Sequence, residues 1–391
     1  MRLSKLSFAP LPAYREITKI FKAINKTDHQ FKESLSIDNS KTFWFSRSAW
    51  ALYTIVKFRM QAFSNRSINI WIPDYFCNSS LLPVRSLGAN IYFYPILNDR
   101  KPDLNECKNM LKNNSPDIIL FVDYFGETLF SEGLFDLARI NNAWLIKDSA
   151  HCLKPLSQVK DADFVLYSPH KLLPIPDGGL LVIQKNGPNN FSNEMLIKFD
   201  FNSIYFSVIN QDKFYNLQEY KWLLKRLLQK LGLPLKSPKV RFNTQESLLN
   251  IKQFSHPVMS EMAKKILFLT RVDFNRESQI RKTNYDEWRK LLMNNAFLKT
   301  VIEIPPVNHV PYLAEIKVID ITQVEKIFDI FKKAQIPIST WPDLAPEVLK
   351  EPVKHNVAIK MRLSRIFLPV HSSINPYLIG LTLKNLRIKG D

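Results

Sequence analysis

The chain has 391 residues, of which 46% are hydrophobic and 23% are charged, as is usual for a soluble globular protein of two or three domains. Its net charge of +18 suits nucleic acid, an anionic membrane surface or a phosphate-rich substrate. The sequence argues against a membrane-spanning helix, because no apolar run approaches about 18 residues. The basic N-terminus has no apolar signal segment, so we expect it to belong to the mature protein.

Short apolar runs alternate with amphipathic segments between Ser46 and Gln184. In chain order they predict a helix over 49–63, a strand over 68–72, a helix over 79–87 that ends at Gly88, a strand over 90–96, a helix near 103–112, a strand over 118–124, a helix near 131–139, and strands over 143–148, 163–168 and 179–184. This spacing indicates βαβ units and a mostly parallel sheet. Since no helix separates the last two strands, we expect a locally antiparallel edge there.

The pattern changes near residue 255, after a stretch over 185–255 that is hard to interpret. From His256 onward a long helical segment (259–292) precedes a strand over 310–319 and a helix near 322–334. This order predicts a second α+β domain. We therefore divide the chain into an N-terminal segment (1–38), a large domain (39–255) and a small C-terminal domain (256–391).

The densest basic patch lies in residues 221–241 and contains no acid. Its members are Lys221, Lys225, Arg226, Lys230, Lys236, Lys239 and Arg241. With Trp222, Leu223, Leu227, Leu228 and Leu231 on the other side, the simpler interpretation is a helix that packs on the core and exposes its basic face to solvent. The alternative is peripheral contact with a membrane surface or a polyanion. Because the other basic residues are spread along the chain, we expect no nucleic-acid partner.

Cysteine and glycine usage narrows the chemistry further. The three cysteines, Cys77, Cys107 and Cys152, have no Cys-x-x-Cys spacing, which argues against disulfides and structural zinc and favours a cytoplasmic setting. The nine glycines assemble into no dinucleotide fingerprint and no P-loop. Neither a Gly-x-Ser-x-Gly elbow nor a His-Glu-x-x-His site occurs, and we expect no bound metal.

Candidate catalytic residues follow the predicted strands, because functional groups gather at the carboxyl ends of strands in open parallel sheets. This rule selects Asp123, Asp148 and the Ser-Pro-His-Lys run at 168–171. Pyridoxal 5′-phosphate (PLP) needs a lysine that forms a Schiff base and a carboxylate that faces its ring nitrogen. It also needs a phosphate site at a helix N-terminus, and Ser46-Arg47-Ser48 precedes the helix over 49–63. Taken alone, a lysine after a strand is usually a surface lysine, and an aspartate at a strand end usually forms a turn or caps a helix. Ser-Arg-Ser before a helix is more often only an N-cap.

Together these features lie in runs that resemble a known family. FSRSAWALY, INIWIPDYFCNSSLLPVRSLGANIYFYPI, DIILFVDYFGE, WLIKDSAH and DFVLYSPHKLLPIPDGGLLVI are similar, in register over about residues 43–184, to the DegT/StrS family of PLP-dependent sugar aminotransferases. ISTWPDL and LSRIFLPVH resemble that family's small domain. The resemblance implies the aspartate-aminotransferase fold (PLP fold type I): an α/β large domain with a mostly parallel seven-stranded sheet flanked by helices, and a smaller α+β C-terminal domain.

The resemblance also implies roles for individual residues. Lys171 matches the family's Schiff-base lysine, and Asp148 matches the aspartate that faces the ring nitrogen. His151 falls where the family has Gln or His near the cofactor's 3-hydroxyl. Arg47 and Ser48 match the phosphate-binding turn. Gly126 and Gly178-Gly179 occupy turn positions that the family also fills with glycine.

The sequence departs from the family at several positions. Leu166 stands where the family has its phosphate-binding serine; Ser168 lies three residues before the lysine instead, as in cysteine desulfurases, and we expect it to reach the phosphate. Cys77 stands where an aromatic residue usually stacks on the ring, so Tyr75, Phe76 or the sulfur itself is expected to take that place. We find no Gly-x-Asn-x-Arg-Met segment. His170 is interpreted as a structural histidine, and His371 as a residue near the mouth of the site.

The function implied by the resemblance is transfer of an amino group, from glutamate by family analogy, to a keto-sugar that we expect to be nucleotide-linked. We expect the protein to be a cytoplasmic homodimer that serves polysaccharide or surface-glycan biosynthesis. The alternatives are another PLP reaction, such as a lyase, or a non-catalytic regulatory protein on the same scaffold. The family's dehydratase branch replaces the lysine with histidine, so Lys171 argues against that branch.

Overall fold

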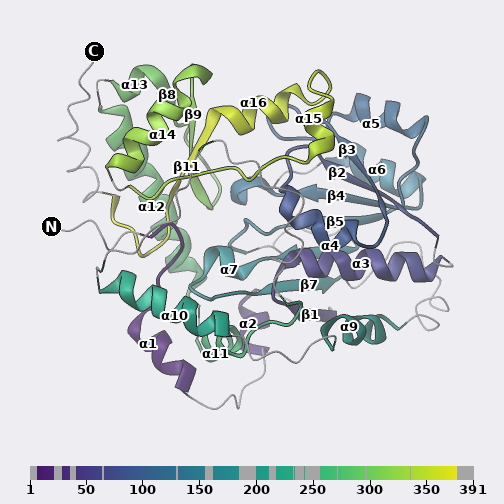
Figure 1. Ribbon diagram of the computed structural model, residues 1–391, viewed down its shortest axis with the longest axis horizontal. Coiled ribbons are helices and arrows are strands. Elements are labelled where there is room, and N and C mark those ends of the chain that lie inside the picture. Colours follow the sequence, from purple (N-terminus) through teal and green to yellow (C-terminus); the bar gives the residue numbers. More distant parts are fainter. Residues whose placement is uncertain are drawn as a thin grey trace.

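The computed structural model describes residues 7–21, 29–35, 41–63, 66–128, 131–154, 162–184, 200–210, 217–231, 233, 242, 256–270, 272–295, 297–334 and 336–376. A large sheet with flanking helices forms one part of the molecule, and a smaller sheet with its own helices lies beyond one end of it (Figure 1). This arrangement confirms the predicted fold class.

The large sheet has seven strands in the order β1-β7-β6-β5-β4-β2-β3. They are β1 (Lys41–Phe45), β2 (Asn69–Pro73), β3 (Asn90–Tyr94), β4 (Ile118–Val122), β5 (Trp144–Asp148), β6 (Phe164–Tyr167) and β7 (Gly179–Ile183). The strands from β3 to β6 pair in parallel, and β7 pairs antiparallel with both β6 and β1. Every residue of β4 to β7 is buried, as in sheets with helices on both faces.

Residues of β6 show which helices cover the two faces. Phe164 and Leu166 belong to the core cluster that includes helix α3 (Ser48–Ala62), whereas Val165 and Tyr167 belong to the cluster that includes α11 (Glu261–Leu269). The alternation follows from the two-residue repeat of a strand. The two sides of the sheet are therefore closed by helices that lie about 200 residues apart in the sequence.

Strand β1 corrects one prediction. The last two predicted strands do run antiparallel, but β7 lies inside the sheet, and β1, which the sequence analysis did not predict, forms the edge. Only alternate residues of β1 are buried, so it lacks the continuous apolar run that marks the central strands.

The remaining elements of the first part of the chain are short. They are α1 (Tyr14–Ile17), η2 (Thr18–Phe21), α2 (His29–Ser34), η3 (Asn78–Leu81), α4 (Leu82–Arg85), α5 (Leu104–Leu111), η4 (Tyr124–Gly126), α6 (Glu132–Ile140), α7 (Pro169–Leu172), α9 (Phe201–Ile209) and α10 (Leu217–Lys230). As predicted, Gly88 follows the helical segment after β2 with a positive φ of 73°, a conformation that glycine adopts without strain.

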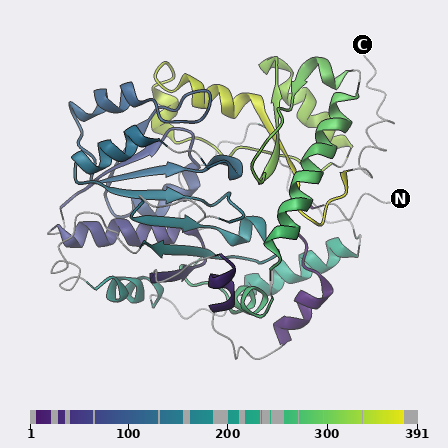
Figure 2. The same ribbon diagram turned by 180° about the vertical axis from the view of Figure 1, so that it is seen from behind.

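The small sheet is antiparallel, in the order β10-β11-β9-β8. Its strands are β8 (Ile302–Glu303), β9 (Leu313–Val318), β10 (Ser339–Thr340) and β11 (Arg365–Pro369), and its helical elements are α13 (Leu298–Val301), η6 (Ile321–Gln323), α14 (Val324–Lys333), α15 (Pro346–Lys350) and α16 (Asn356–Ser364). The long helix α12 (Phe274–Met293) runs from this sheet toward the large domain (Figure 2).

Helix α11 bears on the domain boundary. Its N-cap Ser260 accepts a hydrogen bond from the Ala263 N–H, and its apolar side, with Met262 and Ile266, packs on the large sheet. The apolar cluster that holds the small sheet includes residues of α12 from Tyr285 onward, and none before it. Helix α11 and the first turn of α12 therefore pack on the large sheet although they follow residue 255, and the division at residue 255 stays a prediction.

Polar contacts connect the two parts. The Asp74 carboxylate, just after β2, lies 2.9 Å from Nδ1 of His355, the residue before α16, and the two are 0% and 2% exposed. The Arg100 guanidinium lies 2.7 Å from Glu315 on β9 and 3.2 Å from Glu127. Within the described residues, no helix combines the length and apolarity that crossing a membrane requires.

Candidate active site

A cavity of about 1100 Å³ opens where β5 and β6 end, beside the N-terminus of α3. Five predicted site residues line it: Arg47, Ser48, Asp148, His151 and Lys171. Its opposite wall comes from the small domain and includes Tyr312 and the segment over 339–342. The cavity thus lies at the strand ends where ligands bind in open α/β sheets.

Lys171 lies in α7, the short helix that follows β6. Its Nζ is 3.3 Å from Nε2 of His151. The other ring nitrogen, Nδ1, accepts the Phe125 N–H at 3.4 Å, which assigns the histidine proton to Nε2. His151 can then donate to the lone pair of a neutral Lys171 amine.

Burial governs the protonation of this pair. It lowers the pKa of the Lys171 amine, although the Asp148 carboxylate counteracts part of this effect. It also lowers the pKa of His151 well below the usual range, with a further contribution from the charge of Lys171. A neutral amine is the nucleophilic form, so the site favours covalent chemistry at Lys171.

Asp148 is the last residue of β5, and its Oδ1 accepts the Ala150 N–H at 2.9 Å. Burial raises its pKa, and the nearby Lys171 opposes this rise. Asp123, the other predicted strand-end carboxylate, does not line the cavity. It is 0% exposed, lies 3.1 Å from Lys147 and accepts the Ser149 hydroxyl at 2.7 Å. Asp123 therefore stabilises the turn that follows Asp148.

The turn before α3 is shaped for an anion. The Arg47 side chain, at the N-cap, makes no capping hydrogen bond, and the first turn contains no acid. The Ser48 hydroxyl accepts a hydrogen bond from Ser168 Oγ at 2.9 Å. Ser168 itself does not line the cavity, so its contact with the site passes through Ser48. Amide groups at such a turn, with the positive end of the helix dipole, bind phosphate.

Gly179 makes this turn possible. A Cβ added there would lie 2.4 Å from the Arg47 carbonyl carbon and 2.5 Å from the Ser48 nitrogen. Neighbouring Gly178 has a φ of 141° and donates its N–H to the Ser46 carbonyl at 2.7 Å. Because a side chain at position 179 would collide with the backbone, β7 approaches the turn only with glycine there.

Aromatic residues surround the space beside Lys171. At the position where the family stacks a ring, Cys77 and Phe76 both line the cavity. Tyr75 does not, because it packs against Trp341 with ring centroids 4.4 Å apart. The Tyr312 ring stacks on His151 at 4.7 Å and 6°. Of the ring neighbours expected from the sequence, Phe76 and Cys77 thus remain as candidates.

The sequence analysis missed several lining residues. They are Phe8, Gln218, His256, Tyr312 and Trp341. Trp341 lies in ISTWPDL, which the resemblance to the family had already pointed to. His256 is placed by its backbone: its carbonyl accepts the Ser46 hydroxyl, and the Pro257 carbonyl accepts the Ser46 N–H at 2.8 Å.

The other two histidines have different positions. His170 lines the cavity, and its Nδ1 donates to the Gly178 carbonyl at 2.7 Å. Burial, and then Arg47, lower its pKa well below the usual range. His371, expected near the mouth of the site, is buried and does not line the cavity. Its Nε2 donates to the Ser7 and Phe8 carbonyls at 3.1 and 3.2 Å, and Phe8 does line the cavity.

Helix α10 carries four members of the predicted basic patch; Lys236, Lys239 and Arg241 lie outside the described residues. Arg226 donates to Ser7 Oγ at 3.1 Å and Lys230 to the Pro12 carbonyl at 2.7 Å, so these two bind the N-terminal segment. Lys221 and Lys225 are exposed. Trp222, Leu223 and Leu227 pack on the core cluster that includes α11, as the simpler interpretation predicts. Leu231, predicted on the same side, is instead exposed, as are Tyr220 and Leu224.

No family model and no curated protein matches the sequence, but solved structures match nearly the whole chain. Helicobacter pylori PseC, an aminotransferase involved in the biosynthesis of pseudoaminic acid, is 17% identical over 97% of this chain and 98% of its own, with a TM-score of 0.67. The putative sugar aminotransferase Spr1654 from Streptococcus pneumoniae, in its apo form, is 16% identical over 97% of each chain, with a TM-score of 0.68.

A third similar structure is that of the GDP-4-keto-6-deoxymannose-3-dehydratase ColD, which is 11% identical over 97% of this chain and 98% of its own, with a TM-score of 0.64. Spr1654 also has structures in PLP and PMP forms. At these identities the likeness shows the fold. This chain has the fold of these proteins, as its sequence predicts.

Proposed function

We propose that this chain is a PLP-dependent aminotransferase that transfers an amino group to a keto-sugar. One observation carries the proposal: Lys171, Asp148, His151 and the turn before α3 converge on a single cavity. The names of proteins that share the fold support it, since PseC is an aminotransferase and Spr1654 a putative sugar aminotransferase.

The residues fit the cofactor. A buried carboxylate, Asp148, suits a protonated ring nitrogen, and the uncapped N-terminus of α3, with Ser48 beside it, suits the phosphate. Position 179 admits no side chain, which keeps this turn open. When bound, PLP supplies an aromatic ring that takes up electrons released at the substrate carbon.

The chain's own residues then have distinct tasks. Lys171 would hold the cofactor covalently, and its amine would move a proton at the substrate carbon. Asp148 would face the ring nitrogen and, as an ionised carboxylate, would keep it protonated. His151, neutral and stacked under Tyr312, donates a hydrogen bond beside Lys171. The small-domain wall at 339–342 excludes water and contacts the substrate.

The substrate class rests on weaker support. A cavity of about 1100 Å³ exceeds what many single ligands occupy, and the ColD structure contains bound GDP-perosamine. We propose a nucleotide-linked keto-sugar as acceptor and glutamate as donor, in polysaccharide or surface-glycan biosynthesis. ColD is a dehydratase, so another PLP reaction is the second candidate; retained Lys171 favours transamination. A non-catalytic regulatory protein on the same scaffold is the third.

Absorbance spectroscopy tests the cofactor and the reaction. Wild-type protein mixed with PLP should turn yellow, borohydride should fix the cofactor on Lys171, and glutamate should bleach the band. Lys171→Ala should lose the covalent attachment and essentially all turnover, whereas the exposed neighbour Lys154 provides Lys154→Ala as the control. A colourless protein would refute the proposal. A yellow protein that ignores glutamate and other amino donors would favour the second candidate.

We further propose a cytoplasmic homodimer, with weak peripheral contact between the exposed side of α10 and anionic membranes. Tyr220, Leu224 and Leu231 are exposed beside Lys221 and Lys225, a combination typical of interfacial helices. Lys221→Glu with Lys225→Glu should abolish co-sedimentation with phosphatidylserine vesicles. If wild-type protein forms a dimer and does not sediment with vesicles, we would instead propose that the exposed side of α10 contacts the partner subunit.

A further inference from the structure

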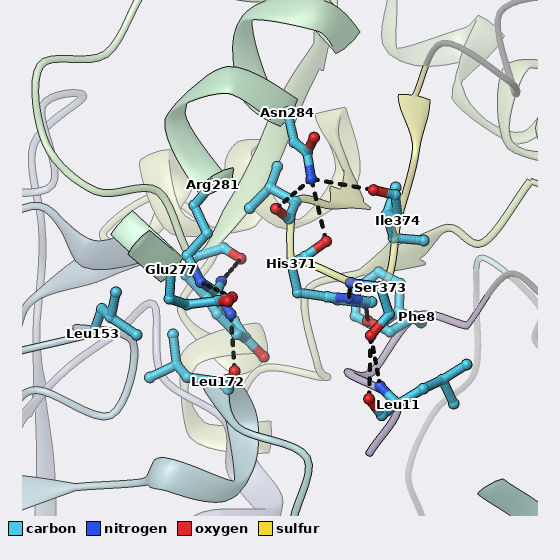
Figure 3. A network of polar contacts seen from close by, with 12 residues as sticks. Phe8, Leu11, Leu153, Leu172, Glu277, Arg281, Asn284, His371, Ser373 and Ile374 are labelled. Atoms are coloured by element: carbon cyan, nitrogen blue, oxygen red, sulfur yellow. Dashed lines mark hydrogen bonds and ion pairs between the residues drawn. The ribbon is translucent and has the colours of Figure 1, made fainter. Parts of the chain in front are cut away.

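One face of α12 carries a row of polar side chains, of which Arg281, Asn284 and Trp288 are buried. Glu277, Arg281, Asn284 and Trp288 follow each other at the spacing that places residues on a single helix face. Figure 3 shows Arg281 and Asn284 pointing from the helix toward backbone carbonyls of other segments, with Glu277 beside Arg281. The sequence of this helix is rich in charge, and the structure shows which charges turn inward.

Arg281 is 1% exposed, and its guanidinium contacts oxygen atoms of three residues. It donates to the Leu172 carbonyl at 2.9 Å and to the Tyr312 carbonyl at 3.2 Å, and it forms an ion pair with Glu277 at 3.1 Å. The planar guanidinium presents several donors in fixed directions, so one side chain can hold two segments at once. Glu277 balances the charge that burial would otherwise leave unpaired.

These two segments are the two sides of the contact between Lys171 and His151. Leu172 directly follows Lys171 and ends α7, a helix of only four residues, which is too short to be stable alone. Its last carbonyls lack helical partners, and Arg281 supplies one. Tyr312 carries the ring stacked on His151 and donates its N–H to the Phe125 carbonyl at 2.8 Å.

The same face of α12 holds the chain that leaves the small sheet. Asn284 donates to the Val370 and His371 carbonyls at 3.0 and 3.2 Å, and Trp288 Nε1 donates to the Pro369 carbonyl at 2.8 Å. One rigid helix therefore connects the end of β11 with the segment that carries Lys171.

We propose that Arg281 is a positioning residue that fixes Lys171 relative to His151 and Asp148 from outside the cavity. The inference rests on the proposed function and extends it. Arg281 touches neither the cavity nor the reacting atoms; it acts through the Leu172 and Tyr312 carbonyls.

The test compares two buried arginines. Arg281→Met keeps the length and removes the donors, and Arg281→Lys keeps the charge but can reach fewer acceptors. The control is Arg59→Met, since Arg59 is 4% exposed, donates to the Asn142 carbonyl at 2.9 Å and lies 3.8 Å from Asp117. Arg59 lines no part of the cavity, so its loss should affect stability alone.

We expect Arg281→Met to lower kcat roughly 10- to 100-fold at nearly unchanged KM, because a displacement of about 1 Å can have such an effect. The pH titration of the cofactor absorbance band should shift by roughly 0.5 or more in its pKa. Arg281→Lys should lie between this variant and wild type. Arg59→Met should lower the melting temperature but leave kcat and the titration unchanged.

The possible results separate failure of the inference on Arg281 from failure of the proposed function. If Arg281→Met does not fold, Arg281→Lys carries the comparison. Arg281 variants whose kcat and titration match those of wild type, or change only as in Arg59→Met, would overturn the inference while leaving the proposed function intact. A wild-type protein that binds no PLP would refute the proposed function, and the inference with it.

Discussion

The two walls of the cavity are built differently. The candidate catalytic residues of the large-domain wall lie at the end of a buried strand or in a helix that directly follows a strand: Asp148 ends β5, Lys171 lies in α7 and Ser48 begins α3. The small-domain wall includes β10, which has two residues, adjoining loop residues such as Trp341, and single residues of β9 and β11. Strand ends hold a functional group rigidly, whereas loops vary without disturbing the core. We therefore propose that the first wall carries the chemistry and the second wall chooses the substrate.

The largest expected effect is that of Asp148→Asn, which tests whether the large-domain wall carries the chemistry. The variant keeps the shape of the wall and removes the charge that holds the ring nitrogen protonated, so kcat should fall by roughly 10²- to 10³-fold. Steady-state kinetics, with PLP binding followed by absorbance, would measure it. A variant that retained wild-type kcat would show that the chemistry does not depend on the strand-end carboxylate.

Trp341→Ala should show the opposite pattern, with a KM for the keto substrate raised about tenfold, a smaller change in kcat and an unchanged cofactor band. Trp341 is 7% exposed and stacks on Tyr75, so the protein should also lose about 3 kcal/mol of stability. Trp341→Phe, which keeps a ring, is the matched control. An altered cofactor band would mean that the small-domain wall also serves the chemistry.

The smallest expected effect is the pH dependence of stability that comes from His371, the histidine that donates to carbonyls of the N-terminal segment. Burial lowers the pKa of His371 to about 3, so the folded protein keeps this histidine neutral while the unfolded chain takes up a proton below its ordinary pKa of about 6.5. This contribution is fully present above that pH and falls away as the pH decreases, by about 2 kcal/mol between pH 7 and pH 5.

Chemical denaturation at both pH values would measure this change, and His371→Gln should reduce it. Part of the pH dependence should persist in the variant, because burial also lowers the pKa values of His151 and His170. If His371→Gln loses as much stability between pH 7 and pH 5 as wild type does, the assignment to His371 is contradicted.

Sequence reasoning identified cavity-lining residues where they adjoin strong local patterns. Asp148 and Lys171 follow continuous apolar runs, and such runs mark central strands. Tyr312 lies 161 residues after His151, the ring it stacks on, so no local pattern could pair them. Arg281 sits in a helix whose many charges suggest solvent exposure, and only tertiary packing decides which charge is buried.

Two kinds of local signal were too weak. Strand β1 alternates buried and exposed positions over five residues, which differs little from a loop. The turn at Ser46 to Ser48 was found, but its dependence on Gly179 was not, because that depends on two backbones meeting across the β1–β7 pair. Close backbone approach leaves no trace in periodicity.

The polar contacts between the two parts limit how freely this architecture can be recombined. Asp74 and His355 belong to different segments and are both buried, and Arg100 and Glu315, also from different segments, form a partly buried ion pair. Replacing the small domain with that of a relative would leave charges buried without partners unless both members of each pair were transferred together. Chimeras designed to change the substrate should therefore be planned around these pairs, and segments chosen by sequence boundaries alone should fold poorly.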